Sequence, residues 1–186
     1  MQPKTYEVLI VGGGIMGSSL AYHLMAFDPR LQVAVVEKDP TYARCSTTLS
    51  AANLRTVAFS LNENFLIARQ TFKLLETFEK DMAVDGTPPK VYFRAEGNLF
   101  LTDSSGLAAA RRIFTAQKGL GSNAEWLSPE EIQRRWPLFN LEGIAGGTFG
   151  PTDGHLDSYG LLMAYKSKAR SLGADSLKDE VTARTK

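Results

Sequence analysis

The sequence has 186 residues, a length that suits one medium domain or one domain with part of another. Hydrophobic residues make up 44% of it and charged residues 22%, so a buried core of ordinary size is expected. The 21 basic and 20 acidic side chains nearly cancel, which argues against nucleic acid or an anionic membrane as a partner.

The first part of the chain alternates strand and helix patterns. Tyr6–Val11 is a short apolar run that leads into three glycines, which is typical of a strand buried on both faces of a parallel sheet. The apolar spacing predicts a helix over Ile15–Phe27, and Leu31–Glu37 is expected as a second strand. Tyr42–Ser60 lacks periodicity and is expected as a loop, whereas Asn62–Met82 has the strongest helical spacing.

The second part is predicted to contain antiparallel structure. Val91–Thr102 has the pattern of a two-stranded hairpin that turns at Ala95–Asn98. Ser128 begins a capping box with proline at the first helical position, which predicts a short helix that stops before Pro137. The other elements expected here are helices over 106–117 and 158–172 and strands over 143–149, 174–177 and 180–185.

A glycine motif connects the first strand to the first helix. Gly12–Gly17 matches G-x-G-x-x-G, in which Gly12 allows a tight turn, Gly14 a close backbone approach to a pyrophosphate, and Gly17 close helix–strand packing. Glu37 ends the next strand, where a carboxylate accepts hydrogen bonds from a ribose 2′-OH. A purely structural glycine turn is the alternative. The dinucleotide interpretation gives these predicted cofactor-binding residues: Gly12, Gly13, Gly14, Ile15, Met16, Gly17, Glu37 and Lys38.

The number of residues between the second and third parallel strands distinguishes an FAD-binding domain from an NAD-binding one. A simple nicotinamide domain places that strand soon after the second one. Here the next candidate is Ala174–Leu177, and a helix-rich insertion with the predicted hairpin precedes it. This order favours a flavoenzyme in which a second domain closes over the isoalloxazine ring.

The chain resembles the D-amino-acid oxidase/sarcosine oxidase (DAO) superfamily, which uses FAD. The resemblance spans nearly the whole chain and is carried by Val8–Gly17, Val35–Lys38, Cys45–Arg55, Gly97–Leu101 and Gly150–Asp157. It implies an α/β fold with a Rossmann-type FAD-binding domain, a parallel sheet with flanking helices, and the start of an antiparallel substrate domain. Residues 1–84 and 151–186 are then expected in the FAD-binding domain, and residues 85–150 in a partial substrate domain.

The same resemblance implies roles for a Ser/Thr segment and one arginine. In such proteins this segment runs past the flavin pyrophosphate and ribityl chain, although a surface loop is the alternative. Leu49 stands near the place where some relatives attach flavin to a histidine, so no covalent link is expected there. Arg55 is expected to hold a substrate carboxylate or the pyrophosphate, or to be a solvated structural residue. The hydroxyls implied as FAD ligands are those of Ser46, Thr47, Thr48 and Ser50.

The activity implied by the resemblance is hydride transfer from a small secondary or N-methylated amino acid to flavin, an oxidation of the CH–NH group. The alternatives are a 2-hydroxy-acid or glycerol-phosphate dehydrogenase, a non-catalytic assembly factor with the FAD fold, and another dinucleotide-binding module. No residue is assigned a catalytic role. Because strands of the main sheet are missing, the chain is expected to be a truncated product that binds flavin weakly, does not turn over alone, and associates through the free edge of the first strand.

Other reactive residues receive structural interpretations. A single cysteine, Cys45, excludes an internal disulfide and a multi-cysteine metal site, and it fits a reducing compartment. Two histidines, His23 and His155, are too few for a metal site. Asp153 and Asp157 are interpreted as turn and N-cap residues rather than as an acid–base pair. With no signal peptide and no stretch of ~20 apolar residues, a cytoplasmic protein without a transmembrane segment is expected.

Overall fold

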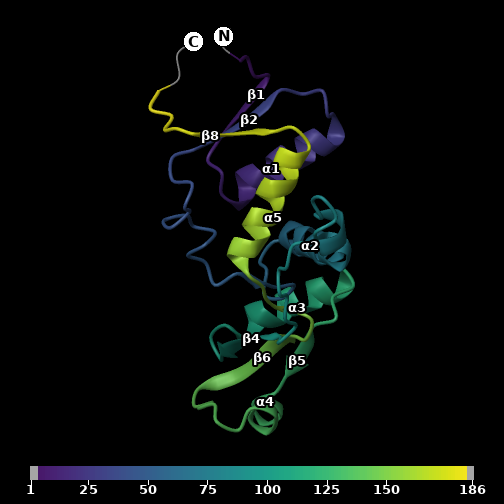
Figure 1. Ribbon diagram of the computed structural model, residues 1–186. Helices are drawn as coiled ribbons and strands as arrows, with labels where there is room; N and C mark the ends of the chain where they lie inside the picture. The colour runs from purple at the N-terminus through teal and green to yellow at the C-terminus, as the bar shows by residue number, and fades with distance from the viewer. Residues whose placement is uncertain (1–3, 184–186) are drawn as a thin grey trace. The chain divides into compact units, whose positions relative to one another are not determined.

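A computed structural model describes residues 4–183 (Figure 1). Within these residues, no helix is both long and apolar enough to cross a lipid bilayer. The elements in chain order are β1 (Val8–Val11), α1 (Ile15–Phe27), β2 (Val33–Glu37), β3 (Asn53–Leu54), α2 (Asn62–Asp81), β4 (Asn98–Asp103), α3 (Leu107–Gly119), β5 (Glu125–Leu127), α4 (Pro129–Arg135), β6 (Ile144–Gly150), β7 (Gly154–His155), α5 (Ser158–Ser171) and β8 (Asp175–Lys178).

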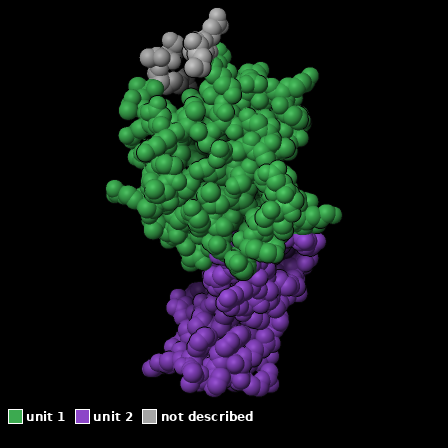
Figure 2. Space-filling view, in the orientation of Figure 1, with its two compact units in different colours: residues 1–52, 77–92, 157–186 green, residues 53–76, 93–156 purple. Residues whose placement is uncertain are grey.

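The chain divides into two compact units (Figure 2). Unit 1 comprises Met1–Ala52, Thr77–Tyr92 and Asp157–Lys186, and unit 2 comprises Asn53–Glu76 and Phe93–Leu156. Each unit has a three-stranded sheet of its own, parallel in unit 1 and antiparallel in unit 2.

The sheet of unit 1 has the strand order β1-β2-β8, with all pairs parallel. In the register, Val8 faces Val33 of β2, and Ala34 of β2 faces Asp175 of β8. The central strand β2 is buried along Val33–Val36, which is the expected environment of a strand covered on both faces. β1 lies at one edge of this sheet, as the sequence predicted. A parallel sheet with flanking helices confirms the predicted α/β class.

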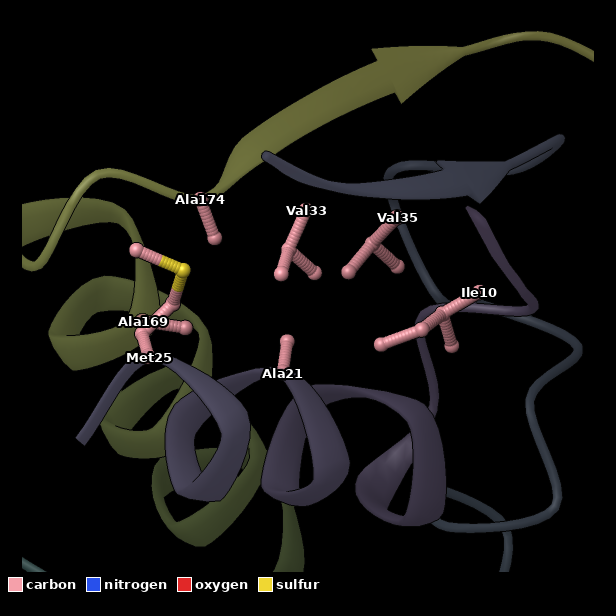
Figure 3. Packing of buried hydrophobic residues seen from close by; sticks show 7 residues of the cluster. All are labelled: Ile10, Ala21, Met25, Val33, Val35, Ala169 and Ala174. Atoms are coloured by element: carbon pink, nitrogen blue, oxygen red, sulfur yellow. The ribbon is translucent and has the colours of Figure 1, made fainter. Parts of the chain in front are cut away.

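Small and branched side chains fill the core between this sheet and the helices α1 and α5 (Figure 3). Ala21 of α1 is fully buried and points toward Val33 and Val35 of β2 in Figure 3. Ala169 of α5, 3% exposed, and Met25 of α1 lie in the same cluster. Because alanines occupy these positions, the helices can pack closely on the sheet, and the end of β1 is held against the start of α1.

Unit 2 is built around the antiparallel order β4-β6-β5, with β6 in the centre. A second, two-stranded sheet pairs β3 with β7, so that Leu54 faces Gly154. The short helix α4 begins as predicted, because the Ser128 hydroxyl accepts a hydrogen bond from the Glu131 amide and the Glu131 carboxylate accepts one from the Ser128 amide.

The hairpin predicted over Val91–Thr102 is wrong. Only its second half forms a strand, and that strand, β4, pairs with β6. Tyr92 and Gly97 have φ values of 48° and 82°, left-handed conformations that interrupt an extended strand. Arg94 forms an isolated antiparallel bridge with His155 instead. The residue pattern therefore indicated extended structure in this segment, but not the strand with which it pairs.

The predicted helices agree closely with the structure. α1 has the predicted bounds Ile15–Phe27. α5 begins after Asp157, whose carboxylate accepts hydrogen bonds from the amides of Tyr159 and Gly160, both 3.0 Å long, which confirms the predicted N-cap. The strand expected over 180–185 does not form at residues 180–183, and residues 184–186 lie outside the described range.

Candidate functional site

The glycine turn sits where β1 ends and α1 begins. The Gly12 amide donates a 2.8 Å hydrogen bond to the Val36 carbonyl, and Gly12 has a φ of 95° that favours glycine. A β-carbon at Gly17 would lie 1.9 Å from the Gly12 carbonyl oxygen. The first turn of α1 therefore contacts the end of β1 without room for any side chain at this position.

The Glu37 carboxylate lies directly against this turn. Its Oε2 accepts a 2.7 Å hydrogen bond from the Gly13 amide, and its Oε1 accepts one of 2.8 Å from the Asp39 amide. A β-carbon at Gly13 would lie 3.1 Å from Glu37 Cβ. Parallel pairing of β1 and β2 thus brings the carboxylate and the glycine turn together at the carboxyl ends of neighbouring strands.

The N-terminus of α1 opens at the same place. Gly14 is the N-cap and provides no side-chain cap, and the Ile15 amide instead donates a 3.1 Å hydrogen bond to the Thr47 hydroxyl. The amides of a first helical turn lack partners within the helix, and the helix dipole makes this end positive. The turn therefore has the geometry and the sign of charge that suit a phosphate.

In the Ser/Thr segment, one hydroxyl contacts the glycine turn and two others stabilise the segment's own loop. Only Thr47 of the predicted hydroxyls bonds to the glycine turn. Thr48 donates to the carbonyls of Tyr42 and Cys45 at 2.6 and 2.9 Å, and Ser50 donates to the Thr47 carbonyl at 2.7 Å. These bonds fix the loop that presents Thr47. Ser46 is exposed.

Two further predicted residues are exposed to solvent. The Met16 side chain is 82% exposed, so only its backbone belongs to the helix start. Lys38 is exposed and forms a 3.3 Å ion pair with Glu180. Within residues 4–183, the Glu37 carboxylate forms its hydrogen bonds with the Gly13 and Asp39 amides and none with these two side chains.

Two buried residues beside the glycine turn, Tyr42 and Ser18, were not among the predicted site residues. Tyr42 is 3% exposed, and its hydroxyl oxygen lies 3.1 Å from the position of a Gly13 β-carbon. Ser18, 2% exposed, donates a 2.7 Å hydrogen bond to the Gly13 carbonyl. A lone aromatic residue in a polar loop is a signal of burial that could have identified Tyr42.

A pocket adjoins Glu37 and Tyr42 in unit 1, and basic side chains contribute to its lining. Lys166 and Arg170 come from α5, and Lys178 comes from the end of β8. The Lys166 ammonium lies 4.7 Å from the centre of the Tyr42 ring, a cation–π arrangement. The positive lining adds to the anion-attracting character of this end of the sheet.

Arg55 belongs to unit 2, where two aromatic rings hold it. Its guanidinium lies 4.7 Å from the centre of the Phe59 ring and 4.8 Å from that of Phe100. Arg55 lines a largely apolar pocket, and no ion pair joins it to a carboxylate within residues 4–183. A planar guanidinium held in this way can bind a carboxylate through two parallel hydrogen bonds.

Asp153 is the one fully buried carboxylate that the structure describes. Its Oδ1 accepts hydrogen bonds from both the amide and the hydroxyl of Thr56, each 2.8 Å long. Burial raises the pKa of the Asp153 carboxyl group, and the hydrogen bonds from Thr56 act in the opposite direction. Asp153 thus does more than form a turn.

The remaining histidines and the cysteine have ordinary surroundings. His23 is exposed on α1, with its ring 4.8 Å from that of Tyr22. His155 Nε2 lies 3.2 Å from the side-chain Nδ2 of Asn53. Cys45 Sγ lies 3.1 Å from the position of a Gly14 β-carbon. In the described residues, no three His, Cys, Asp or Glu side chains are placed to hold a metal ion.

A parallel β–α–β unit, with a glycine turn and a carboxylate at the end of its second strand, defines a dinucleotide-binding protein of the Rossmann type. The family model DAO, described as FAD dependent oxidoreductase, matches residues 7–186. The chain belongs to this family of FAD-dependent oxidoreductases.

Several known proteins are similar over most of the chain. FAD-dependent oxidoreductase domain-containing protein 1 of Bos taurus is 34% identical over 187 residues, covering 98% of this chain and 38% of the relative. Mitochondrial dimethylglycine dehydrogenase of Homo sapiens is 32% identical over 169 residues, covering 90% of this chain and 19% of the relative. The crystal structure of L-proline dehydrogenase from P. horikoshii has a TM-score of 0.79 and 25% identity, covering 95% of this chain and 44% of that chain. The chain spans less than half the length of these relatives.

Proposed function

We propose that this chain is the FAD-binding part of an oxidoreductase that oxidises a small secondary or N-methylated amino acid. The contact between the Glu37 carboxylate and the Gly13 amide carries the proposal, because it places an acceptor for ribose hydroxyls beside a phosphate-binding turn. Membership of an FAD-dependent family supports the cofactor. Dimethylglycine and L-proline, named in two of the similar proteins, are an N-methylated and a secondary amino acid and support the substrate class.

The residues around the turn fit the ADP part of FAD. A β-carbon at Gly13 would contact Glu37 and Tyr42, and one at Gly14 would contact Cys45 and Thr47. Glycine at both positions keeps the backbone open to a diphosphate, which the amides at the start of α1 would bind. The Glu37 carboxylate would accept the ribose hydroxyls, and the short Ser/Thr side chains would leave room for the ribityl chain.

The substrate end of the reaction is assigned to unit 2. Arg55 would hold the substrate carboxylate through its guanidinium, whose orientation is restricted by Phe59 and Phe100. The two aromatic faces would lower the local dielectric around such an ion pair and so strengthen it. The chemistry that bound FAD would supply here is acceptance of a hydride from the substrate C–H bond.

Glu37→Gln tests the cofactor site. A glutamine has one carbonyl oxygen, so its amide group must face either the Gly13 or the Asp39 amide, and one acceptor is lost. We expect the dissociation constant for FAD, measured by quenching of flavin fluorescence, to rise about tenfold. Glu76→Gln, at an exposed position on α2, serves as the control and should leave the affinity unchanged.

Three results would count against the proposal. Equal FAD affinity of the Glu37→Gln variant and the unmodified chain would remove the assigned role of the carboxylate. Displacement of bound FAD by a lower concentration of NAD, seen as recovery of flavin fluorescence, would contradict the proposed cofactor. Tighter binding of a 2-hydroxy acid or glycerol phosphate than of dimethylglycine or L-proline to the FAD-saturated chain would contradict the proposed substrate class.

A further inference from the structure

Asp153 connects two segments that lie far apart in the sequence. Its Oδ1 accepts both the amide and the hydroxyl of Thr56, which precedes it by 97 residues. The Gly97 amide donates a 2.8 Å hydrogen bond to the Asp153 carbonyl. Asp153 therefore bonds through its side chain and its backbone to two segments of unit 2.

This arrangement is costly for a residue that only forms a turn. The turn itself is closed by the Asp153 amide, which donates to the Gly150 carbonyl at 3.2 Å and needs no carboxyl group. The carboxyl group is nevertheless fully buried, and its Oδ2 has no hydrogen-bond partner in the described structure. A β-carbon at Gly150 would lie 2.4 Å from Oδ2, so glycine at this position makes space for the group. A buried polar atom without a partner carries a free-energy cost, and its presence calls for a role.

The residue fixed by Asp153 is the neighbour of Arg55. On one side of Arg55, the two bonds to Asp153 fix the Thr56 backbone. On the other side, Leu54 of β3 pairs with Gly154 of β7, the residue after Asp153. The residues on both sides of Arg55 are thus bound by the two consecutive residues Asp153 and Gly154, which restricts the Arg55 backbone. Its guanidinium is left free of carboxylate partners in the described structure and faces the rings of Phe59 and Phe100.

We propose that Asp153 is a positioning residue, whose Oδ1 holds Thr56 so that Arg55 presents its guanidinium to the carboxylate of the ligand. The inference rests on the proposed role of Arg55 in substrate binding. It adds that an acceptor atom at Oδ1, rather than a negative charge, is what the site requires. The pocket of unit 2 that Arg55 lines with Leu54, Phe59, Ile67 and Phe72 is apolar enough to take the carbon skeleton of a small amino acid.

The test compares L-proline with L-prolinamide, which lacks the carboxylate, on the FAD-saturated chain. Isothermal titration calorimetry gives the dissociation constant of each ligand. Asp153→Ala removes the acceptor and is expected to weaken L-proline binding about tenfold, with L-prolinamide unchanged. Asp153→Asn keeps a carbonyl oxygen for Thr56 and is expected to bind L-proline as the unmodified chain does.

Two substitutions at Thr56 keep the test informative even if Asp153→Ala does not fold. Thr56→Val removes the hydroxyl donor at nearly equal volume and is expected to weaken L-proline binding about threefold, whereas Thr56→Ser keeps the donor and the affinity. Because the amide ligand makes no ion pair, a merely structural role would weaken both ligands equally. That outcome would overturn the inference.

Arg55→Met separates this inference from the proposed function. We expect the variant to lose selectivity for L-proline over L-prolinamide. Unchanged L-proline affinity in Arg55→Met would remove the proposed role of Arg55, and the inference with it. Loss of selectivity in Arg55→Met, with full selectivity in both Asp153→Ala and Thr56→Val, would overturn the inference alone.

Discussion

Replacing Gly17 with alanine is expected to destabilise unit 1 by about 3 kcal/mol and to abolish FAD binding. The new β-carbon would lie 1.9 Å from the Gly12 carbonyl oxygen and 3.2 Å from Ile10 Cγ2. The first of these atoms belongs to the backbone and cannot rotate away, so α1 must move off the end of β1. That movement would pull Ala21 and Met25 out of the core shown in Figure 3 and open the turn assigned to the diphosphate.

The free energy of unfolding of this variant can be measured by circular dichroism in a urea titration, and FAD binding by flavin fluorescence. Phe27→Ala is the matched control, because Phe27 ends the same helix with its side chain 88% exposed. It should unfold at nearly the urea concentration of the unmodified chain. Gly17→Ala with unchanged stability and unchanged FAD affinity would contradict the close contact between α1 and β1.

The part of the fold that depends on local signals could be predicted from the sequence. The first strand, the glycine turn and α1 follow one another within about twenty residues, and each has its own pattern of apolar residues or glycine. Glu37 could be placed because the carboxyl ends of adjacent parallel strands meet at one edge of a sheet. Asp157 and Ser128 were recognised from capping patterns that span only three or four residues.

Pairings between distant segments could not be predicted in the same way. β4 contains an apolar run that favours a strand, but its partner β6 begins at Ile144, and no turn signal links the two. The strands β3 and β7 have two residues each, too few for a periodic pattern. The roles of the Ser/Thr segment could not be predicted either, because they depend on the path of the loop. Thr47 accepts a hydrogen bond from the Ile15 amide, whereas Thr48 and Ser50 form hydrogen bonds within the loop.

Gly154→Ala is the second substitution with a large expected effect, and it tests the distant pairing in unit 2 directly. A β-carbon at Gly154 would lie 1.8 Å from the Arg94 carbonyl oxygen and 3.1 Å from Ala95 Cα. Backbone atoms again block it, so the bridge between Arg94 and His155, with hydrogen bonds of 2.8 and 3.1 Å, must separate. The pairing of Leu54 with Gly154 would be disturbed as well. We expect a loss of about 3 kcal/mol in the stability of unit 2.

Tryptophan fluorescence in a urea titration reports this loss specifically, because both tryptophans, Trp126 and Trp136, belong to unit 2. Gly119→Ala is the control in the same unit, since no atom lies within 4 Å of its β-carbon position and alanine favours the end of α3 by up to about 1 kcal/mol. The control should keep or slightly raise the midpoint. If Gly154→Ala kept it too, residues 94–95 could not lie against β7. Arg94 would then be free to pair with β4, as the predicted hairpin requires.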